Sequence, residues 1–442
     1  MDKWVGWCRD SSSRAPLDGA GAGVNRRNID GAIQFRGGDA DGCRRFGNGP
    51  PGGSGVFGIM TGRNVGRTCH DAVMFIPPAH YAARLRGCLI AGAVGDALGA
   101  PVEFMSGADI ERRYWAGGPR DFIPIRFGSV QGVGLITDDT QMTLFTVEGI
   151  IRASVRDRQR GLGFTVGVVQ HAYLRWLDTQ QQPAPPPEVD GWFAQERWLY
   201  SRRAPGTTCM SALKAASREQ FGKAAVNNSK GCGAVMRSAP FGFLPVWDPP
   251  EDKFRFECAT TAAGYTHGHP TGQLAARGLA HIIAAIVDGA TLHGAVDTAI
   301  RRLDVLPGSA ETTAALRQAV ALADDGEVSR RAVESLGGGW VAEEALAISV
   351  YCALVRAEPA QLADALAVAV THSGDSDSTG AICGNILGSL HGEAAVPVYL
   401  SEQVEGRDAL LTLADDMVTE FTRDPDTEDA DLEAWWGRYP GW

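Results

Sequence analysis

Long apolar runs are missing from this sequence of 442 residues. A membrane-spanning helix needs roughly 18 to 20 uninterrupted apolar residues, and even the richest stretch, residues 274–287, is broken by Arg277 and His281. A secretory signal is not visible, because no apolar run follows Lys3. The nine cysteines contain no C-x-x-C pair, which argues against a disulfide framework and a thiolate zinc site. We therefore expect a protein of the reducing cytoplasm that does not cross a membrane.

An excess of positive charge is also lacking. Lys and Arg number 41 against 52 Asp and Glu, a formal charge of −11, so the basic surface of a non-specific nucleic-acid binder is not expected. The charge is uneven, since residues 1–70 carry +4 and residues 401–442 carry −9. With 44% hydrophobic and 21% charged residues, the composition excludes disorder throughout.

The first 75 residues lack periodic apolar positions. Residues 1–70 hold 16 glycines, and such a segment buries too little surface to offset its ordering entropy. We predict a largely disordered extension over residues 1–75, which is a flexible tail, a functional arm, or an over-long gene start with translation beginning near Met60 or Met74. At the other end, residues 426–442 are predicted to form an acidic, Trp-rich tail.

From Tyr81 onward, apolar residues recur three and four positions apart, which is typical of buried helices. Extended patterns are confined to short stretches such as residues 122–127. Because no period of 20 to 50 residues repeats, a helical solenoid is disfavoured. We predict one compact all-α domain over residues 80–425, an orthogonal helical bundle. Its expected helices lie near residues 82–100, 140–154, 164–178, 207–220, 254–264, 271–288, 290–303, 311–324, 342–357, 360–370, 378–390 and 406–423.

A first acidic cluster, Thr137-Asp138-Asp139-Thr140, follows Gly134 and runs directly into an apolar helix. Thr or Asp at a helix start often does nothing more than cap it, because its oxygen accepts a free backbone N–H group of the first turn. Two adjacent carboxylates point in different directions, however, and one cap needs only one of them. A divergent pair beside a hydroxyl suits a hard cation better.

A second cluster, Gly374-Asp375-Ser376-Asp377-Ser378, opens the helix expected near residues 378–390. In an extended loop Asp375 and Asp377 can point to the same side, with the Ser378 hydroxyl one residue further on. Closely spaced oxygen ligands are what Mg²⁺, Mn²⁺ or Ca²⁺ require. An EF-hand is disfavoured, because the twelfth residue counted from Asp375 is Ile386 and not glutamate.

A glycine-rich helix forms a third element, from Gly87 to Phe104. Four glycines in a helix cost about 1 kcal/mol each relative to alanine, so we expect close packing or backbone contact with a ligand there. Asp96 has two possible roles: it either caps a helix or joins a hydrogen-bond network in the interior, or it belongs to the ligand site. Glu103 comes just after Pro101, which should end the helix, and could add a carboxylate to the metal site.

Two further loops complete the candidate set. The glycine-rich loop Asn227–Arg237 could cradle a phosphate or diphosphate with its backbone N–H groups, although a tight turn between helices is the simpler interpretation. The string Tyr265-Thr-His267-Gly-His269 holds two histidines two residues apart. Such a pair is more often a helix cap and a surface residue, and without a third imidazole at suitable spacing we expect no zinc site.

Five short strings, taken in order along the chain, resemble the motifs of the ADP-ribosylglycohydrolase family. They are G-D-A-L-G-A-P-V-E, T-D-D-T, N-x-S-x-G-x-G-x-x-M-R, T-H-x-H-P-T-G and G-D-S-D-S. No single string is diagnostic, but five in the family's order, from Gly87 to about Gly392, are highly specific. The founding members remove ADP-ribose from arginine in dinitrogenase reductase. The resemblance implies an all-helical fold with a cleft that holds two Mg²⁺ or Mn²⁺ ions.

The resemblance also implies roles for individual residues. It places Glu103 close to the metal site, and from the chemistry of the reaction we expect Glu103 or Asp138 to transfer the proton, with Asp139 as a third catalytic residue. The sequence departs from the family's usual motifs at two places. The last acidic motif reads Asp-Ser-Asp-Ser, where many members have threonine in place of serine. Cys232 stands where relatives often have a small polar residue. The implied metal ligands are Thr137, Asp138, Asp139, Asp375, Asp377 and Ser378. The residues implied to line the diphosphate path are Ser229, Gly231, Cys232 and Gly233, with His267 near the distal ribose or adenine. We add Asp96 to the substrate-binding candidates.

These inferences lead to one function and two alternatives. We expect a metal-dependent hydrolase that cleaves the N-glycosidic bond of an ADP-ribosylated protein, with arginine as the acceptor. One alternative is an immunity or antitoxin protein that blocks a cognate ADP-ribosyltransferase through its N-terminal arm. The other is hydrolysis of a different linkage, on serine, on a nucleic-acid base or in a free metabolite. The poorly patterned loops 110–131 and 180–205 are expected to recognise the acceptor.

Overall fold

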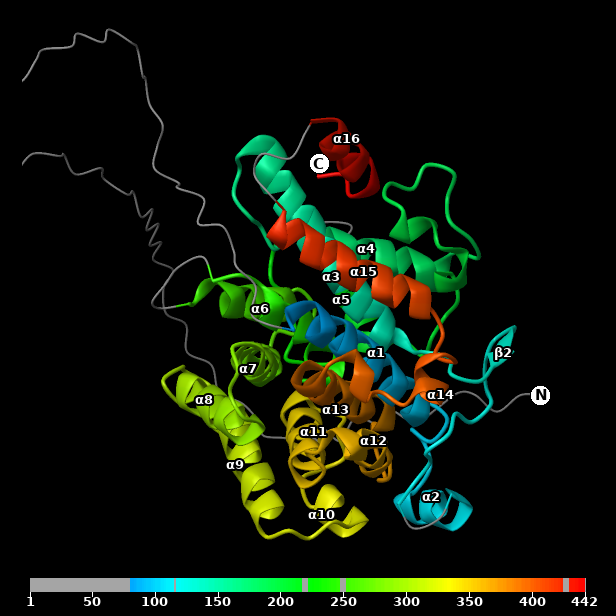
Figure 1. Ribbon diagram of the computed structural model, residues 1–442, viewed down its shortest axis with the longest axis vertical. Helices are drawn as coiled ribbons and strands as arrows, with labels where there is room; N and C mark the ends of the chain where they lie inside the picture. Colours follow the sequence, from blue (N-terminus) through cyan, green and yellow to red (C-terminus); the bar gives the residue numbers. More distant parts are fainter. Residues whose placement is uncertain (1–79, 115–116, 217–221, 247–251, 424–428, 442) are drawn as a thin grey trace, which may run out of the picture. The chain divides into compact units, whose positions relative to one another are not determined.

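The chain is built almost entirely from helices (Figure 1). The computed structural model describes residues 80–114, 117–216, 222–246, 252–423 and 429–441. The α-helices in these ranges are α1 (Tyr81–Gly99), α2 (Gly107–Tyr114), α3 (Asp138–Arg160), α4 (Gly167–Gln181), α5 (Thr207–Ala215), α6 (Phe254–Gly264), α7 (Pro270–Val287), α8 (Leu292–Asp304), α9 (Ala310–Asp324), α10 (Arg330–Glu334), α11 (Ala342–Val355), α12 (Leu362–Ala369), α13 (Ser376–His391), α14 (Val398–Ser401), α15 (Arg407–Thr422) and α16 (Asp429–Arg438).

Strands are minor in the described part of the chain. There, β1 (Ile125–Phe127) and β2 (Val130–Gly132) pair in an antiparallel hairpin, with Ile125 opposite Gly132. The predicted all-α class is therefore confirmed. Each of the twelve expected helices has a counterpart, and the short helices α2, α10, α14 and α16 were not expected.

The segment predicted as a C-terminal tail contains the helix α16. Tyr439, just after this helix, is fully buried, and its hydroxyl donates a hydrogen bond to Asp416 on α15. Arg438 also pairs with Asp416, at 2.7 Å. The end of the chain is thus packed onto the helical domain. The predicted extension over residues 1–75, and the arm proposed within it, lie outside the described residues.

Helices α1 and α13 pack against each other along a seam of small residues. Their glycines meet backbone directly: a Cβ added at Gly95 would lie 2.0 Å from the carbonyl oxygen of Gly380, and one at Gly388 would lie 2.0 Å from that of Gly87. At the far end of the seam, a Cβ on Gly99 would lie 2.3 Å from the carbonyl oxygen of Ser376. The two helices therefore run antiparallel, and the end of α1 meets the start of α13.

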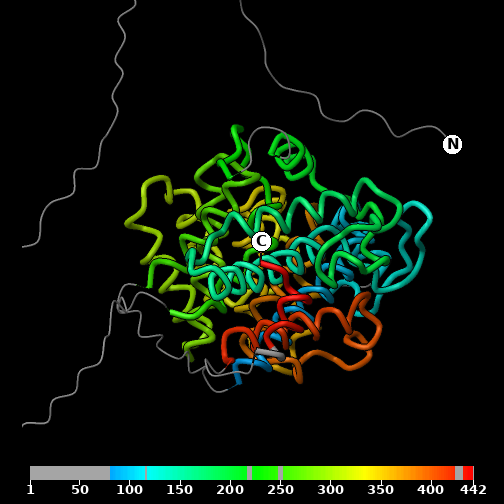
Figure 2. The backbone as a smooth tube through the Cα atoms, turned by 90° about the horizontal axis from the view of Figure 1, so that it is seen from above, coloured from blue at the N-terminus to red at the C-terminus, as the bar shows by residue number. Residues whose placement is uncertain are grey.

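Other helices surround this central pair (Figure 1). On one side α3 packs on α4 and α15, and α15 also contacts α1, as the orange and blue segments of Figure 2 show. On the other side α11 contacts α13, α7 and α9. One extensive hydrophobic cluster joins both sides, and it includes fully buried Phe145, Tyr351 and Leu387. The N-terminal ends of α3 and α13 are held in this framework.

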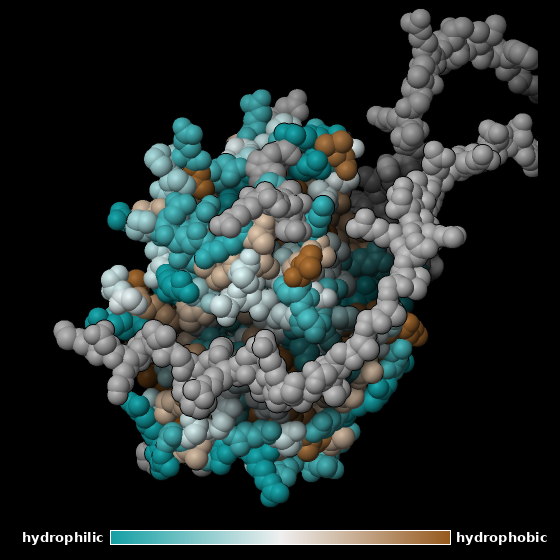
Figure 3. Space-filling view, turned by 180° about the vertical axis from the view of Figure 1, so that it is seen from behind, coloured by the Kyte–Doolittle hydropathy of each residue, from teal (hydrophilic) through white to brown (hydrophobic). Residues whose placement is uncertain are grey.

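The surface of the face seen in Figure 3 is mostly hydrophilic, with hydrophobic residues in small separate patches. Within the described ranges, no helix combines the length and the apolar character that a membrane span requires.

Candidate active site

The end of α1 and the start of α3 are joined by Asp96. Both of its carboxylate oxygens accept the backbone N–H of Thr137, at 3.1 and 3.0 Å, and Oδ2 also accepts the Thr140 N–H at 3.1 Å and the Thr140 hydroxyl at 2.5 Å. Because the first N–H groups of a helix have no partner within it, a carboxylate from another helix satisfies them well. Asp96 thus anchors the loop that carries the first acidic motif, and its predicted role in substrate binding stays a prediction.

Within that motif the three residues have different surroundings. Thr137 is the N-cap of α3, and its hydroxyl oxygen accepts the Asp139 N–H at 3.3 Å. Asp138 is fixed by the segment just before α5, because its N–H donates to the Arg203 carbonyl at 3.0 Å and its Oδ2 accepts the Gly206 N–H at 3.2 Å. Asp139 is 3% exposed, and its Oδ1 has no hydrogen-bond partner among the described residues.

The second acidic motif forms the first turn of α13. Asp375 is the N-cap, and its Oδ1 accepts the Ser378 N–H at 3.3 Å. The Oδ1 atom of Asp377 accepts the same Ser378 N–H at 3.0 Å. The thiol of Cys232 lies 2.7 Å from Asp375 Oδ2. Asp375 thus caps α13 with one oxygen and contacts Cys232 with the other, so a capping role does not exclude a second role for this carboxylate.

The acidic residues of both motifs influence one another although they are far apart in the sequence. Burial raises the pKa of Asp138 and Asp139 well above the ordinary carboxyl value, and the charge of Asp377 raises both further. Burial and the same charge raise the pKa of Asp96 to about 7. The two predicted motifs thus form one cluster of buried carboxylates, which we call the carboxylate cluster: Asp96, Asp138, Asp139, Asp375 and Asp377.

Glu103 reaches this cluster from the rim. It is half-buried, just after the end of α1. Burial raises its pKa to about 10, with further contributions from the charges of Asp377, Asp375, Asp138 and Asp96. The sequence-based expectation that Glu103 joins the two acidic motifs therefore agrees with its electrostatic surroundings.

The donor chemistry of the carboxylate cluster fits hard divalent cations. All its ligand atoms are oxygens, the type that Mg²⁺ and Mn²⁺ prefer, and the unpartnered Asp139 Oδ1 is a buried acceptor in need of a positive partner. Among the described residues, no three His, Cys, Asp or Glu side chains already converge as metal ligands. The fit therefore rests on the donor types, their burial and the raised pKa values of the carboxyls.

The predicted diphosphate loop lies against His267. A Cβ on Gly231 would lie 3.4 Å from the His267 ring, and one on Gly233 would lie 3.3 Å from it. Burial and the nearby Arg237 lower the His267 pKa to about 3, so the ring is neutral. Ser229 is held by a 3.0 Å hydrogen bond between its hydroxyl and that of Thr208. All five residues predicted here are brought together. His269 caps α7 with its side chain, and its N–H donates to the Ser229 carbonyl at 3.2 Å.

Two aromatic rings flank the cluster at the surface. Phe104 follows Glu103 and is 77% exposed, and its ring stacks on that of Trp340, with centroids 5.9 Å apart. Trp340 follows Gly339, where an added Cβ would lie 3.4 Å from Asp375. Two surface hollows, of about 630 and about 580 Å³, are lined by other residues. The candidate site is thus a buried cluster beside an exposed aromatic pair.

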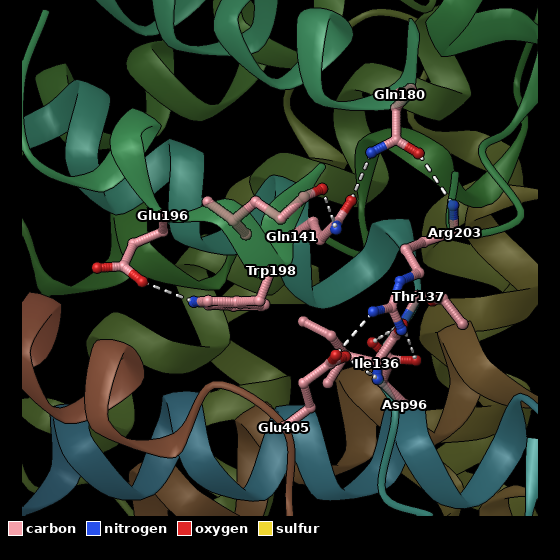
Figure 4. A network of polar contacts seen from close by, with 10 residues as sticks. Asp96, Ile136, Thr137, Gln141, Gln180, Glu196, Trp198, Arg203 and Glu405 are labelled. Atoms are coloured by element: carbon pink, nitrogen blue, oxygen red, sulfur yellow. Dashed lines mark hydrogen bonds and ion pairs between the residues drawn. The ribbon is translucent and has the colours of Figure 1, made fainter. Parts of the chain in front are cut away.

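A polar network behind the first acidic motif was missed in the sequence (Figure 4). Glu405 Oε2 accepts the Ile136 N–H at 3.2 Å, and its Oε1 pairs with the Arg203 guanidinium at 2.7 Å. Arg203, which is 1% exposed, also donates its N–H to Gln180 at 3.0 Å. The loop 180–205, expected only to recognise the acceptor, therefore also supports Asp138. No local pattern distinguishes Arg203 from a surface arginine.

The comparison with known families decides how these motifs are to be understood. Residues 77–427 match the ADP-ribosylglycohydrolase family. The chain belongs to this family.

Two similar proteins illustrate the range of similarity. An uncharacterized protein of Archaeoglobus fulgidus is 26% identical over 344 residues, which cover 75% of this chain and 94% of that protein. A solved structure described as an ADP-ribosylglycohydrolase-related protein complex has a TM-score of 0.53 at 20% identity, and the match covers 77% of this chain and 99% of that one. The resemblance stated from the motifs is confirmed. The protein is a hydrolase of the ADP-ribosylglycohydrolase type.

Proposed function

We propose that this ADP-ribosylglycohydrolase removes ADP-ribose from arginine side chains of modified proteins and that the reaction needs divalent cations. The observation that carries the proposal is the carboxylate cluster. In it, carboxylates of two acidic motifs from distant parts of the chain raise one another's pKa values. An exposed aromatic pair, Phe104 and Trp340, lies beside the cluster. An alternative acceptor remains the competing hypothesis.

The reaction adds water to the anomeric carbon of the ribose as the bond from that carbon to the guanidine nitrogen breaks. A proton passes from the water to the leaving nitrogen, so the products are ADP-ribose and unmodified arginine. The transition state is expected to have oxocarbenium character, and nearby carboxylates stabilise that positive charge. When bound, Mg²⁺ or Mn²⁺ ions would supply a water of lowered pKa.

The metal ligands that we propose are Thr137, Asp138, Asp139, Asp375, Asp377 and Ser378. Asp139 supports this assignment most directly, because its unpartnered Oδ1 is buried. The backbone hydrogen bonds to Asp138 from Gly206 and to the Arg203 carbonyl fix its orientation. Preorganised ligands of this kind lose little entropy when a cation binds.

Glu103 is our first choice for the proton transfer. Its half-buried position at the rim puts its carboxyl between solvent and the cluster, and its raised pKa means that it readily holds a proton. Asp138 is the second choice, because it is fixed by backbone contacts and is less free to approach the leaving group.

The acceptor assignment rests on the aromatic pair. A guanidinium is planar and cationic, and it stacks on aromatic faces while its N–H groups bind carboxylates. Phe104 and Trp340 offer such faces, and Glu103 directly precedes Phe104. A serine-linked substrate would gain nothing from this pair at the acceptor side.

The experiment is to incubate the purified full-length protein with arginine-, serine- and thymidine-linked ADP-ribose and to measure the ADP-ribose released. We expect release from the arginine linkage, lost in chelator and in Asp138→Ala or Asp377→Ala variants that remain folded. Release from serine or thymidine alone would contradict the acceptor assignment. Full activity in thorough chelator would contradict the need for metal.

A further inference from the structure

Cys232 occupies a fixed position at the edge of the carboxylate cluster. It begins the short helix of residues Cys232–Ala234, and its N–H donates to the Trp340 carbonyl at 3.2 Å. The neighbouring Gly231 forms a β-bridge with Val341. The backbone on both sides is thus tied to the segment before α11, so the thiol is directed toward the cluster by the fold.

The thiol faces two of the carboxylates. Its sulfur lies 2.7 Å from Asp375 Oδ2. Burial and the negative charges of Asp375 and Asp139 raise the pKa of the Cys232 thiol, so the sulfur keeps its proton and donates it to Asp375. The sulfur is therefore within reach of the ligand atoms of the second acidic motif.

A second feature of the site also indicates a ligand there. Asp139 is 97% buried, and its Oδ1 has no hydrogen-bond partner in the described part of the chain. The segment that Cys232 begins is joined to the first turn of α3. The Thr143 hydroxyl contacts both the Asp139 carbonyl, at 2.9 Å, and the Met236 carbonyl, at 3.3 Å, and the Met236 N–H donates to the Cys232 carbonyl at 3.2 Å. The hydrogen-bonded thiol and the unpartnered carboxylate oxygen thus belong to adjoining segments of one site.

We propose that Cys232 is a metal-site residue whose sulfur enables this centre to bind soft or borderline divalent cations, such as Cd²⁺ and Co²⁺, in addition to hard ones. The proposal rests on the proposed function only in that the carboxylate cluster binds divalent cations. Thiolate ligands select soft cations, whereas carboxylates alone favour Mg²⁺ and Mn²⁺. As the metal–sulfur bond forms, the S–H proton leaves to solvent, as is usual for cysteine ligands.

The test uses the full-length protein, freed of metal by chelator and then desalted. Wild-type protein and the Cys232→Ser variant are titrated with Cd²⁺ and with Co²⁺, and the ultraviolet thiolate-to-metal charge-transfer band is recorded. We expect a difference band of one thiolate per protein, and a fall in Cd²⁺ affinity of about tenfold or more in the variant. Mn²⁺ affinity, measured by electron paramagnetic resonance, should change less than Cd²⁺ affinity.

Cys209→Ser is the matched control, because Cys209 is a buried cysteine that also feels the charge of Asp138, but its sulfur contacts Arg237 and the Gly233 carbonyl and not a carboxylate oxygen. This variant should keep the wild-type band. If Cys232→Ser does not fold, as judged by circular dichroism, Cys232→Ala takes its place.

An identical band in the wild type and the Cys232 variant would overturn the proposal, and so would loss of the band in Cys209→Ser only. If Mn²⁺ binds while Cd²⁺ gives no band, the result contradicts the role of Cys232 as a ligand for soft cations and supports the metal centre of the proposed function. If neither cation binds, the metal centre of the proposed function fails as well.

Discussion

Asp96 on α1 accepts the backbone N–H of Thr137 on the neighbouring segment with both carboxylate oxygens, at 3.1 and 3.0 Å. Through this contact Asp96, in the glycine-rich helix, sets the position of the first acidic motif, which begins 41 residues later at Thr137. The same carboxylate accepts two donors of Thr140, so it fills the role that a capping side chain usually has within its own helix.

Replacing Asp96 by alanine should loosen the start of α3. With Mn²⁺ present, we expect the free energy of unfolding to fall by about 2 kcal/mol, since buried hydrogen bonds to a charged group are lost. Mn²⁺ affinity should fall about tenfold or more. Urea denaturation and metal titration measure the two effects. Thr140→Val, which removes one hydroxyl donor only, should cost about 1 kcal/mol, and equal effects of both variants would contradict the anchoring role.

The metal-free protein should become less stable as the pH rises. Glu103 has a folded-state pKa of about 10 and Asp96 one of about 7, both above their unfolded values. Through these two groups the folded form holds more protons than the unfolded form, and stability falls with pH by at most about 1.4 kcal/mol per pH unit and group. Buried histidines such as His267, with its lowered pKa of about 3, contribute the opposite slope below about pH 6.5. Urea denaturation in chelator between about pH 7.5 and pH 9.5 therefore measures the slope of the carboxyls. Excess Mn²⁺ should flatten it, and a rise in metal-free stability with pH would contradict the electrostatic description.

Asp139→Asn should separate stability from metal binding. The substitution removes one negative charge from a buried group of like charges, so the metal-free variant should melt at a higher temperature than the wild type. The extra stabilisation by Mn²⁺ should be reduced, because a ligand is lost. Thermal denaturation with and without Mn²⁺ measures both. Asp364→Asn, at an exposed pair with Arg120, is the control and should change neither.

The Glu405–Arg203 pair should matter far more than an exposed ion pair. Glu405→Gln weakens the charged contact to a guanidinium that is 1% exposed, and we expect a loss of about 2 kcal/mol in unfolding free energy. Asp415→Asn breaks an exposed pair with Arg86 and should cost less than about 1 kcal/mol. Urea denaturation of the two variants provides the comparison. Similar small losses would show that the buried pair does not support the site.

Trp340→Ala should affect the arginine acceptor and leave ADP-ribose binding almost unchanged. Loss of a stacking face costs about 1 kcal/mol or more, so the KM for arginine-linked substrate should rise about fivefold to tenfold, with kcat less affected. Steady-state kinetics and calorimetry with ADP-ribose measure these quantities. Val226→Ala changes another exposed apolar residue and serves as the control. Weaker ADP-ribose binding in Trp340→Ala would instead assign the aromatic pair to the adenosine side.

The sequence predicted those parts of the molecule that local patterns encode. Periodic apolar residues located the long helices, and motif spacing located Asp138, Asp139, Asp375 and Asp377. The short helix α16 was missed, because its stability depends on packing of Tyr439 against α15 rather than on a long periodic pattern. Arg203 was missed for a related reason: its burial and its pairing with Glu405 arise only when distant segments meet.

Cys232 illustrates a middle case. Its position in a glycine-rich loop was clear from the sequence, but the loop was expected to face a diphosphate. The contact with Asp375 Oδ2 depends on how the Trp340 segment holds the loop, which no spacing rule describes.

The seam between α1 and α13 has a consequence for how the protein is made. Gly87 and Gly388 touch across almost the whole domain sequence, so a growing chain on the ribosome exposes the apolar α1 long before its partner has been synthesised. Contacts between such distant segments form late and slowly. The site should therefore be completed late, only after Glu405, which holds the loop of the first acidic motif, has left the ribosome, and chaperones that cover apolar helices should bind the unfinished chain.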